Sequence, residues 1–323
     1  MARLTDRRQD WILHKRFGLT PEQVQKAALL RNFARQRLGI ELHVGQLAFG
    51  ALVLTRDEQR PASAESLTLL LASGNRAGKT ALLAVLIIFC CIDKTNRAKP
   101  VTEAEAIKWY SSEYHWYHFG IAQEVADLVF NDIVRILSGI HEGQKDGCPI
   151  TKAGPVASWD KKEYSEYRWI KFMPQWGGAE IHFRTTGERA LGQLGKDMHG
   201  ITFDEAGIER NLNFLIKEVF QFRRLGTGGQ LIMVSTPSEE LGSDFADNWE
   251  LGNPKNPRKL PTWRSLRMST RDNIGYGLDQ EFFDRLVADM DERTIRQKIE
   301  GEFLQRSEEH TSELQSRFGI SYA

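Results

Sequence analysis

The fold is decided by one stretch of sequence, Ser73-Gly74-Asn75-Arg76-Ala77-Gly78-Lys79-Thr80, together with the apolar runs on either side of it. The run before it, Leu67 to Ala72, is short and continuous, which is typical of a buried strand. The run after it, Ala81 to Cys91, is long enough for a buried helix. Small residues between a strand and a helix turn backbone N–H groups toward one anion, and the helix N-terminus adds its dipole. The sequence therefore predicts a phosphate-binding loop.

This loop carries the residue types that bind ATP and its metal ion. Lys79 is predicted to reach the β- and γ-phosphates, and the hydroxyl of Thr80 to bind Mg²⁺. The common Walker A pattern has a glycine five positions before Gly78, where this chain has Ser73. Gly74 is expected to supply the missing flexibility one position later. We therefore predict that residues 73–80 contact ATP.

A second apolar run, Gly200 to Phe203, ends in the acid pair Asp204-Glu205. Open α/β folds bind ligands at the carboxyl ends of their strands, so this pair is expected beside the phosphate loop. Asp204 is predicted to hold Mg²⁺ through water or the Thr80 hydroxyl, as a Walker B acid does. Glu205 is predicted to polarise the attacking water as general base.

A third strand candidate, Gln230 to Ser235, places the hydroxyls of Ser235 and Thr236 before a proline. Such hydroxyls could sense the γ-phosphate. The alternative is an ordinary turn at a strand end, in which the hydroxyls bond to the backbone.

The rest of the chain alternates strand and helix patterns, which predicts a mainly parallel sheet flanked by helices. Residues 138–166 are polar and glycine-rich and indicate a long loop. The other expected elements are a strand at Tyr114 to Ile121, a helix at Gln123 to Leu137, a hairpin of Arg168 to Met173 with Ala179 to Thr185, a helix with the stripe Ile208, Leu212, Leu215 and Val219, and one or two helices at Leu278 to Leu304.

Three segments are predicted. Residues 1–45 form a helical N-terminal segment, in which Thr20 caps a helix that begins at Pro21. Residues 46–305 form the ATPase domain. Residues 306–323 form the tail, of which 306–316 is almost free of apolar side chains and matches the in-frame translation of a common sequencing-library adapter. We expect this tail to be non-native and the natural protein to be longer.

Composition limits the class of protein. The 323 residues include 43 Lys and Arg against 43 Asp and Glu, so the net charge of zero argues against binding nucleic acid by bulk charge. The total does not exclude a local basic face: the stretch 253–271 has six Lys or Arg and no acid, and it is one candidate for contact with nucleic acid. Three cysteines cannot form a disulfide framework, and the longest apolar run is too short to span a bilayer. The expected location is a reducing cytoplasm, without a membrane.

The three strand-end motifs, in this order and spacing, resemble the ATPase domain of the large terminase subunit of tailed bacteriophages. The matching residues are Gly74-Asn75-Arg76-Ala77-Gly78-Lys79-Thr80, Asp204-Glu205-Ala206 and Ser235-Thr236-Pro237. Residues 43–46 and 273–303 are similar to flanking segments of that family. The resemblance, which covers residues 40–305, implies a P-loop NTPase fold of the RecA-like ASCE class.

The resemblance also implies residue roles. Lys79 and Thr80 would bind phosphate and Mg²⁺, and Asp204 would also bind Mg²⁺. Glu205 would be the catalytic base. Arg76 matches an arginine near the γ-phosphate, where a guanidinium could stabilise transition-state charge; the alternative is a surface ion pair. Gln46 matches an adenine-recognising glutamine, with Gln59 or a plain surface role as alternatives.

The function implied is an ATP-hydrolysing motor that translocates double-stranded DNA into a procapsid. The partners implied are the portal protein, the small terminase subunit and further copies of the chain in a ring. Family members carry a C-terminal nuclease, for which residues 1–305 offer no acid cluster, so we expect no DNA cleavage. The alternatives are a helicase-like DNA-dependent ATPase and an ATP-dependent assembly module.

Two histidines outside these motifs, His115 and His118, raise the question of a metal ion. They flank a strand with no evident carboxylate partner in register, so structural or surface histidines are expected instead.

Overall fold

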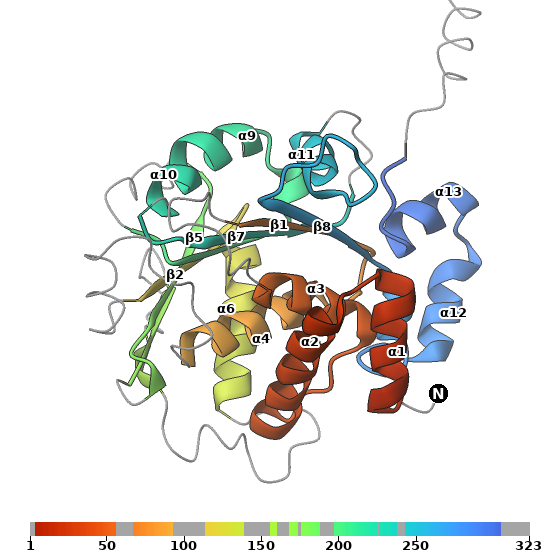
Figure 1. The fold of residues 1–323 in the computed structure, drawn as a ribbon, viewed down its shortest axis with the longest axis horizontal. Helices are drawn as coiled ribbons and strands as arrows, with labels where there is room; N and C mark the ends of the chain where they lie inside the picture. Colours follow the sequence, from red (N-terminus) through yellow and green to blue (C-terminus); the bar gives the residue numbers. More distant parts are fainter. Residues whose placement is uncertain are drawn as a thin grey trace, which may run out of the picture.

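The computed structural model describes residues 4–55, 67–92, 114–138, 156–159, 168–173, 176–187, 197–224, 226–237 and 243–304. Strands from these residues form one sheet, in the order β3-β4-β5-β2-β6-β7-β1-β8 (Figure 1). The strands are β1 Thr68–Ser73, β2 His115–Gly120, β3 Val156–Trp159, β4 Arg168–Phe172, β5 Glu180–Thr185, β6 Gly200–Asp204, β7 Gln230–Ser235 and β8 Trp263–Met268.

Most of this sheet is parallel. The neighbours from β5 through β2, β6, β7 and β1 to β8 all run in the same direction, while β4 pairs antiparallel with β5 and β3 antiparallel with β4. β1 and β7 are buried along their whole length, as expected for strands covered on both faces. The predicted α/β class with a mainly parallel sheet is confirmed.

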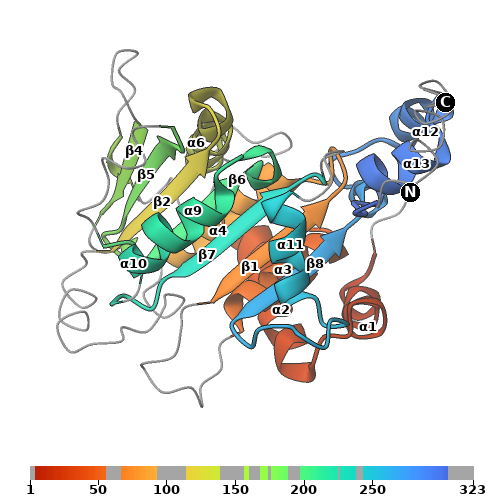
Figure 2. The same cartoon turned by 90° about the horizontal axis from the view of Figure 1, so that it is seen from above.

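Helices cover both faces of the sheet (Figures 1 and 2). On one face lie α1 Asp6–Phe17, α2 Pro21–Phe33 with its π-helical extension Ala34–Leu38, α3 Val44–Leu54, α4 Lys79–Ile92 and α6 Gln123–Leu137. On the other lie α9 Leu212–Phe214 with its π-helical extension Leu215–Phe220, α10 Gln221–Arg224 and α11 Asp244–Gly252. β1 illustrates the two cores, because Leu69 and Leu71 enter the first cluster while Leu70 and Ala72 enter the second.

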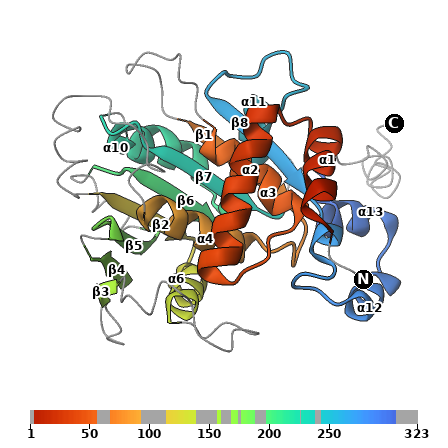
Figure 3. The same cartoon turned by 60° about the horizontal axis from the view of Figure 1, so that its bottom comes forward.

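The N-terminal helices pack across the outside of the first face (Figure 3). Their buried side chains belong to the same apolar cluster as those of α3, α4 and β1. The predicted start of α2 is confirmed, since the Thr20 hydroxyl accepts from the Gln23 backbone and the Gln23 side chain accepts from the Thr20 backbone.

The C-terminal part of the described chain adds short helices beside the end of β1. They are α12 Gln280–Ala288, α13 Glu292–Thr294 and the π-helical turn Ile295–Ile299, preceded by the 3₁₀ turn Thr270–Asn273. The expectation of one or two helices in this region is confirmed, and Phe283 of α12 is buried.

Several expectations were incomplete. The segment predicted as a loop at 138–166 contains β3, and the helix predicted after Glu205 is divided, with a 3₁₀ turn at Ala206–Ile208 that leaves Ile208 57% exposed. The helices α3 and α11 and the strand β8 were not predicted. Residues 306–323, Gln59 and Cys148 lie outside the described residues. No helix in the described part of the chain is long and apolar enough to cross a membrane.

Candidate nucleotide-binding site

The predicted phosphate loop joins the end of β1 to the first turn of α4. The chain reverses through two residues in left-handed backbone conformation, Arg76 with φ 58° and Gly78 with φ 82°. Glycine adopts this conformation freely, whereas in other residues it costs roughly 1–2 kcal/mol, so Arg76 is held there by its surroundings. The expected strand, loop and helix context is confirmed.

Part of that restraint comes from the C-terminal segments. The backbone N–H of Asn75 donates to the Lys298 carbonyl at 2.6 Å, and Thr270 Oγ1 donates to the Asn75 carbonyl at 2.6 Å. The Asn273 side chain donates to the Arg76 carbonyl at 2.8 Å. Because the Asn75 amide is already bonded, phosphate contacts would fall to the amides nearer the start of α4.

The N-terminus of α3 supports the loop from the other side. His43 Nε2 donates to the Ala77 carbonyl at 2.9 Å, and Gln46 Nε2 donates to the Gly78 carbonyl at 2.9 Å. Gln46 Oε1 accepts from the His43 backbone N–H at 3.1 Å, so both ends of the Gln46 amide are bonded. The adenine contact stays a prediction, and what the structure shows for Gln46 is a brace on the loop.

His43 was missed by the sequence analysis. Its ring is fully buried, and burial lowers its pKa to about 4 although the bond to the Ala77 carbonyl acts in the opposite direction. A neutral ring with its proton on Nε2 therefore holds the loop. Its position three residues before Gln46 was the only available signal, because the helix that it caps was not predicted.

The predicted catalytic side chains converge at the carboxyl edge of β6, β1 and β7. Lys79 Nζ donates to Thr236 Oγ1 at 2.7 Å and lies 3.4 Å from Glu205 Oε1. Ser235 Oγ donates to Glu205 Oε2 at 3.2 Å, and Thr236 Oγ1 donates to Asn75 Oδ1 at 3.0 Å. The three predicted motifs thus form one connected set of contacts, with Glu205 held in left-handed backbone conformation at φ 56°.

The predicted Mg²⁺ ligands also lie together. Thr80 Oγ1 is 3.5 Å from Asp204 Oδ2, close to the separation of about 3 Å between neighbouring oxygens around an octahedral Mg²⁺. Burial and the nearby Glu205 charge raise the Asp204 pKa to about 6, which a bound cation would counteract. A hydroxyl and a buried carboxylate suit this hard cation, so the residues present fit it.

Arg76 points away from this set. Its guanidinium lies over the ring of Phe282 on α12, 4.9 Å from the ring centroid. This cation–π contact is neither the γ-phosphate contact nor the surface ion pair considered from the sequence. The assignment of Arg76 to the γ-phosphate stays a prediction.

The basic stretch 253–271 divides into two parts. Arg264, in β8, donates to the Leu52 and Thr55 carbonyls and therefore joins β8 to α3. The next two arginines form ion pairs with the C-terminal segment, Arg267–Glu302 at 2.7 Å and Arg271–Glu300 at 2.6 Å. Lys255, Arg258 and Lys259 are exposed. Arg267 and Arg271 are exposed as well but are held in these ion pairs, so Lys255, Arg258 and Lys259 are the residues of the stretch that we keep as candidates for DNA contact.

The two histidines near β2 also differ from one another. His118 is fully buried, its Nδ1 lies 3.0 Å from Thr202 Oγ1, and burial lowers its pKa to about 3. His118 is therefore structural, as expected. His115 lies opposite Glu180 in the parallel register of β2 and β5. The expectation that no carboxylate partner lies in register is wrong, because that partner comes from a different strand.

Comparison with known proteins gives matches in structure only: no protein-family profile and no curated protein sequence matches this chain. The ATPase domain of the Thermus phage P74-26 large terminase aligns with a TM-score of 0.55 and 13% identity, over 84% of this chain and 97% of that one. The HK97 bacteriophage large terminase aligns with a TM-score of 0.56 and 15% identity, over 86% of this chain and 55% of that one. The large terminase of the thermophilic bacteriophage D6E aligns with a TM-score of 0.53 and 16% identity, over 81% of this chain and 53% of that one.

These alignments show that the chain has the fold of large terminase ATPase domains, which is a P-loop NTPase fold. The fold implied by the sequence resemblance is confirmed. The chain spans about half the length of the HK97 and D6E proteins.

Proposed function

We propose that this chain is the ATPase motor of viral DNA packaging, which couples ATP hydrolysis to translocation of double-stranded DNA into a procapsid. One observation carries the proposal: the phosphate-loop lysine, the acid after β6 and the hydroxyls after β7 are joined by direct contacts. Lys79 contacts both Glu205 and Thr236, and Glu205 contacts Ser235. Lys79 and Glu205, which are proposed to act on the nucleotide, therefore also contact the two hydroxyls that are proposed to couple hydrolysis to movement.

The proposed chemistry assigns each side chain to one step. Lys79 and the first amides of α4 bind the phosphates, while Glu205 accepts a proton from the attacking water. Thr80 and Asp204 would hold Mg²⁺, which when bound neutralises charge that develops on the phosphate oxygens. Arg76 would stabilise transition-state charge after leaving Phe282.

The nucleotide class is supported by a structural neighbour. The D6E large terminase has been solved in complex with ADP, and that structure aligns with this chain at a TM-score of 0.50 and 17% identity over 81% of the chain. We infer that this chain also binds an adenine nucleotide, with Gln46 at the edge of the same loop.

Coupling is proposed to begin at the end of β7. Thr236 bonds to Lys79 and Asn75, and Ser235 bonds to Glu205, so loss of the γ-phosphate would change partners at both hydroxyls. The exposed Lys255, Arg258 and Lys259 are proposed to contact DNA phosphates, independently of base sequence.

The partners follow from the same proposal. The motor would act as a ring of identical chains on the procapsid, with the portal protein and the small terminase subunit, in the cytoplasm of the infected host. The fold shared with large terminase ATPase domains supports this assignment.

Steady-state ATPase activity with and without linear duplex DNA tests the proposal. We expect DNA to stimulate turnover, and we expect the triple variant Lys255→Glu, Arg258→Glu, Lys259→Glu to lose that stimulation while keeping its DNA-free rate. The matched control, Arg285→Glu with Arg293→Glu, alters exposed cations on α12 and α13 and should behave as wild type. An ATPase rate that does not change when DNA is added would favour the assembly module. Separation of the two DNA strands would favour a helicase-like enzyme.

A further inference from the structure

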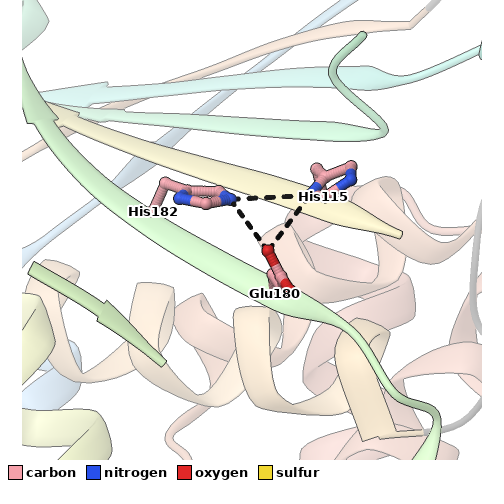
Figure 4. Close-up of side chains that lie close together, drawn as sticks. All are labelled: His115, Glu180 and His182. Carbon is pink, nitrogen blue, oxygen red and sulfur yellow. Dashed lines mark hydrogen bonds and ion pairs between the residues drawn. The ribbon is translucent and has the colours of Figure 1, made fainter. Parts of the chain in front are cut away.

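We propose that His115, Glu180 and His182 form a binding site for one divalent transition-metal ion, of which Zn²⁺ is the best match. The three side chains meet between the first residues of β2 and β5, with ring nitrogens and a carboxylate oxygen facing a common point (Figure 4). The site is separate from the proposed motor chemistry, because the nucleotide residues lie at the opposite, carboxyl ends of the parallel strands.

The sheet itself brings these side chains together. In the parallel register of β2 and β5, His115 is paired with Glu180. Side chains two residues apart on a strand share a face, so His182 lies on the same side as Glu180. Three ligands thus come from two hydrogen-bonded strands, whose backbones hold them in place without any metal.

The distances match a metal site closely. His182 Nε2 lies 3.5 Å from His115 Nδ1 and 3.6 Å from Glu180 Oε2, and His115 Nδ1 lies 3.7 Å from the same oxygen. Zn²⁺ bonds of about 2.0–2.1 Å in tetrahedral geometry place ligand atoms about 3.3–3.4 Å apart. Shifts of a few tenths of an ångström would therefore complete the three protein bonds and leave a fourth position for water.

Neighbouring groups orient the ligands. Lys171 Nζ pairs with Glu180 Oε1 at 2.7 Å, which leaves Oε2 directed at the histidines. The Tyr117 ring stacks on the His182 ring with centroids 4.7 Å apart. The His115 backbone N–H donates to His199 Nδ1 at 3.2 Å. Such outer contacts fix ligand geometry in metal sites.

The ligand chemistry selects the ion. Two imidazoles with one carboxylate are preferred by Zn²⁺ and its neighbours in the first transition row, whereas Mg²⁺ and Ca²⁺ prefer oxygen ligands alone. A bound ion would cross-link β2 to β5 at their amino ends. Its expected effect is stabilisation of the fold, because metal binding to the folded state adds to the free energy of unfolding.

Zinc binding to the full chain tests the site. The protein is first treated with a chelator and dialysed. Excess Mg²⁺ is then present, so that oxygen-ligand sites such as Thr80 with Asp204 are already occupied. Isothermal titration calorimetry with Zn²⁺ should give one site per chain, and zinc should raise the thermal midpoint by several degrees. Co²⁺ in place of zinc should give the visible absorption bands of a tetrahedral site.

Two ligand variants and one control make the test specific. His115→Gln changes a side chain that is 33% exposed, and Glu180→Gln keeps the shape of its side chain, so both should fold while losing at least tenfold in zinc affinity. His14→Gln alters an exposed histidine on α1 and should bind zinc as wild type does. Absence of saturable binding by the wild-type chain, or zinc affinity in both ligand variants equal to that of wild type, would overturn the proposal.

Discussion

Lys79 and Glu205 face each other in the candidate nucleotide site, with Lys79 Nζ 3.4 Å from Glu205 Oε1. One belongs to the first turn of α4 and the other follows β6, so the contact joins the phosphate loop to the proposed catalytic acid. In the proposed function, a bound γ-phosphate would compete with Glu205 for the same ammonium group. Nucleotide binding would therefore release the carboxylate from the lysine at the moment when it must activate water.

Replacing Glu205 with glutamine should separate binding from chemistry. Glu205→Gln removes the base and the charge that competes for Lys79, so Mg·ATP affinity should equal or exceed that of wild type. Turnover should fall by roughly two to four orders of magnitude. Binding of a fluorescent ATP analogue and steady-state phosphate release measure the two effects. Glu218→Gln, which alters an exposed acid in the π-helical segment Leu215–Phe220, is the control. Equal losses of affinity and turnover would make Glu205 a structural residue.

Replacing Lys79 with alanine should weaken nucleotide binding and abolish turnover. The Lys79 side chain is only 9% exposed and its ammonium points at Glu205 and Thr236, where phosphate oxygens are proposed to lie. We expect Mg·ATP affinity to fall at least tenfold and turnover to be lost. The same binding assay on Lys217→Ala, an exposed lysine, provides the comparison. Unchanged affinity in Lys79→Ala would show that the loop is not a phosphate site.

The contact between Arg76 and Phe282 allows a test of the proposed arginine role. The cation–π contact contributes about 0.5–1 kcal/mol at an exposed site, so Phe282→Leu should slightly lower stability and leave turnover intact. Arg76→Ala should lower kcat by roughly a hundredfold or more with little change in Mg·ATP affinity. Single-turnover kinetics measure the rate of ATP hydrolysis in each of the two variants. If both variants lose the same small amount of activity, the contact with Phe282 is the whole role of Arg76.

The sequence predicted those elements whose pattern is set by burial on both faces of the sheet. β1 and β7 are continuous apolar runs, and both were located within one residue. β8 was missed because Arg264 and Arg267 interrupt its apolar residues at the sheet edge, where side chains reach solvent or neighbouring loops. The helix α3 is apolar on nearly all sides and therefore lacks the periodicity that indicates a surface helix.

The candidate site was predictable to a similar extent. Asp204 ends β6 and Glu205 follows it, while Lys79 and Thr80 begin the helix that the loop after β1 leads into, so the sequence placed all four at one edge of the sheet. His43 and Glu180 were missed for a common reason. The role of each depends on which element packs beside it, and neither the docking of α3 nor the pairing of β5 with β2 can be read from local patterns.

A glycine behind the loop should be sensitive to substitution. Gly301 has φ 68°, and a Cβ placed there would lie 2.9 Å from the Ser73 Cα. Gly301→Ala should therefore lower the free energy of unfolding by roughly 1–2 kcal/mol and weaken Mg·ATP binding, because the segment that restrains the loop must move. Urea denaturation measures the first effect. Gly187→Ala is the matched control, since a Cβ there meets no atom within 4 Å. Equal stability of the two variants would contradict this packing.

The buried His43 should make the stability of the fold depend on pH. Its pKa is about 4 in the folded protein and near 6.5 in the unfolded chain, because burial disfavours the charged ring. Between these values the unfolded chain binds more protons than the folded protein, so stability falls as the pH falls. The contribution is complete above about pH 6.5 and is lost as the pH drops toward 4. His118, with a pKa lowered to about 3, acts in the same direction.

The variant His43→Gln isolates the His43 part of this effect. Glutamine keeps an N–H donor for the Ala77 carbonyl but does not titrate. Between pH 7.5 and pH 5, the wild-type free energy of unfolding should fall by roughly 2 kcal/mol more than that of His43→Gln, as the two pKa values require. Urea denaturation at a series of pH values gives this difference directly. His14→Gln, which alters an exposed histidine, should keep the wild-type pH dependence. An unchanged pH dependence in His43→Gln would mean that the ring is protonated equally in both states, and that a neutral imidazole does not hold the phosphate loop.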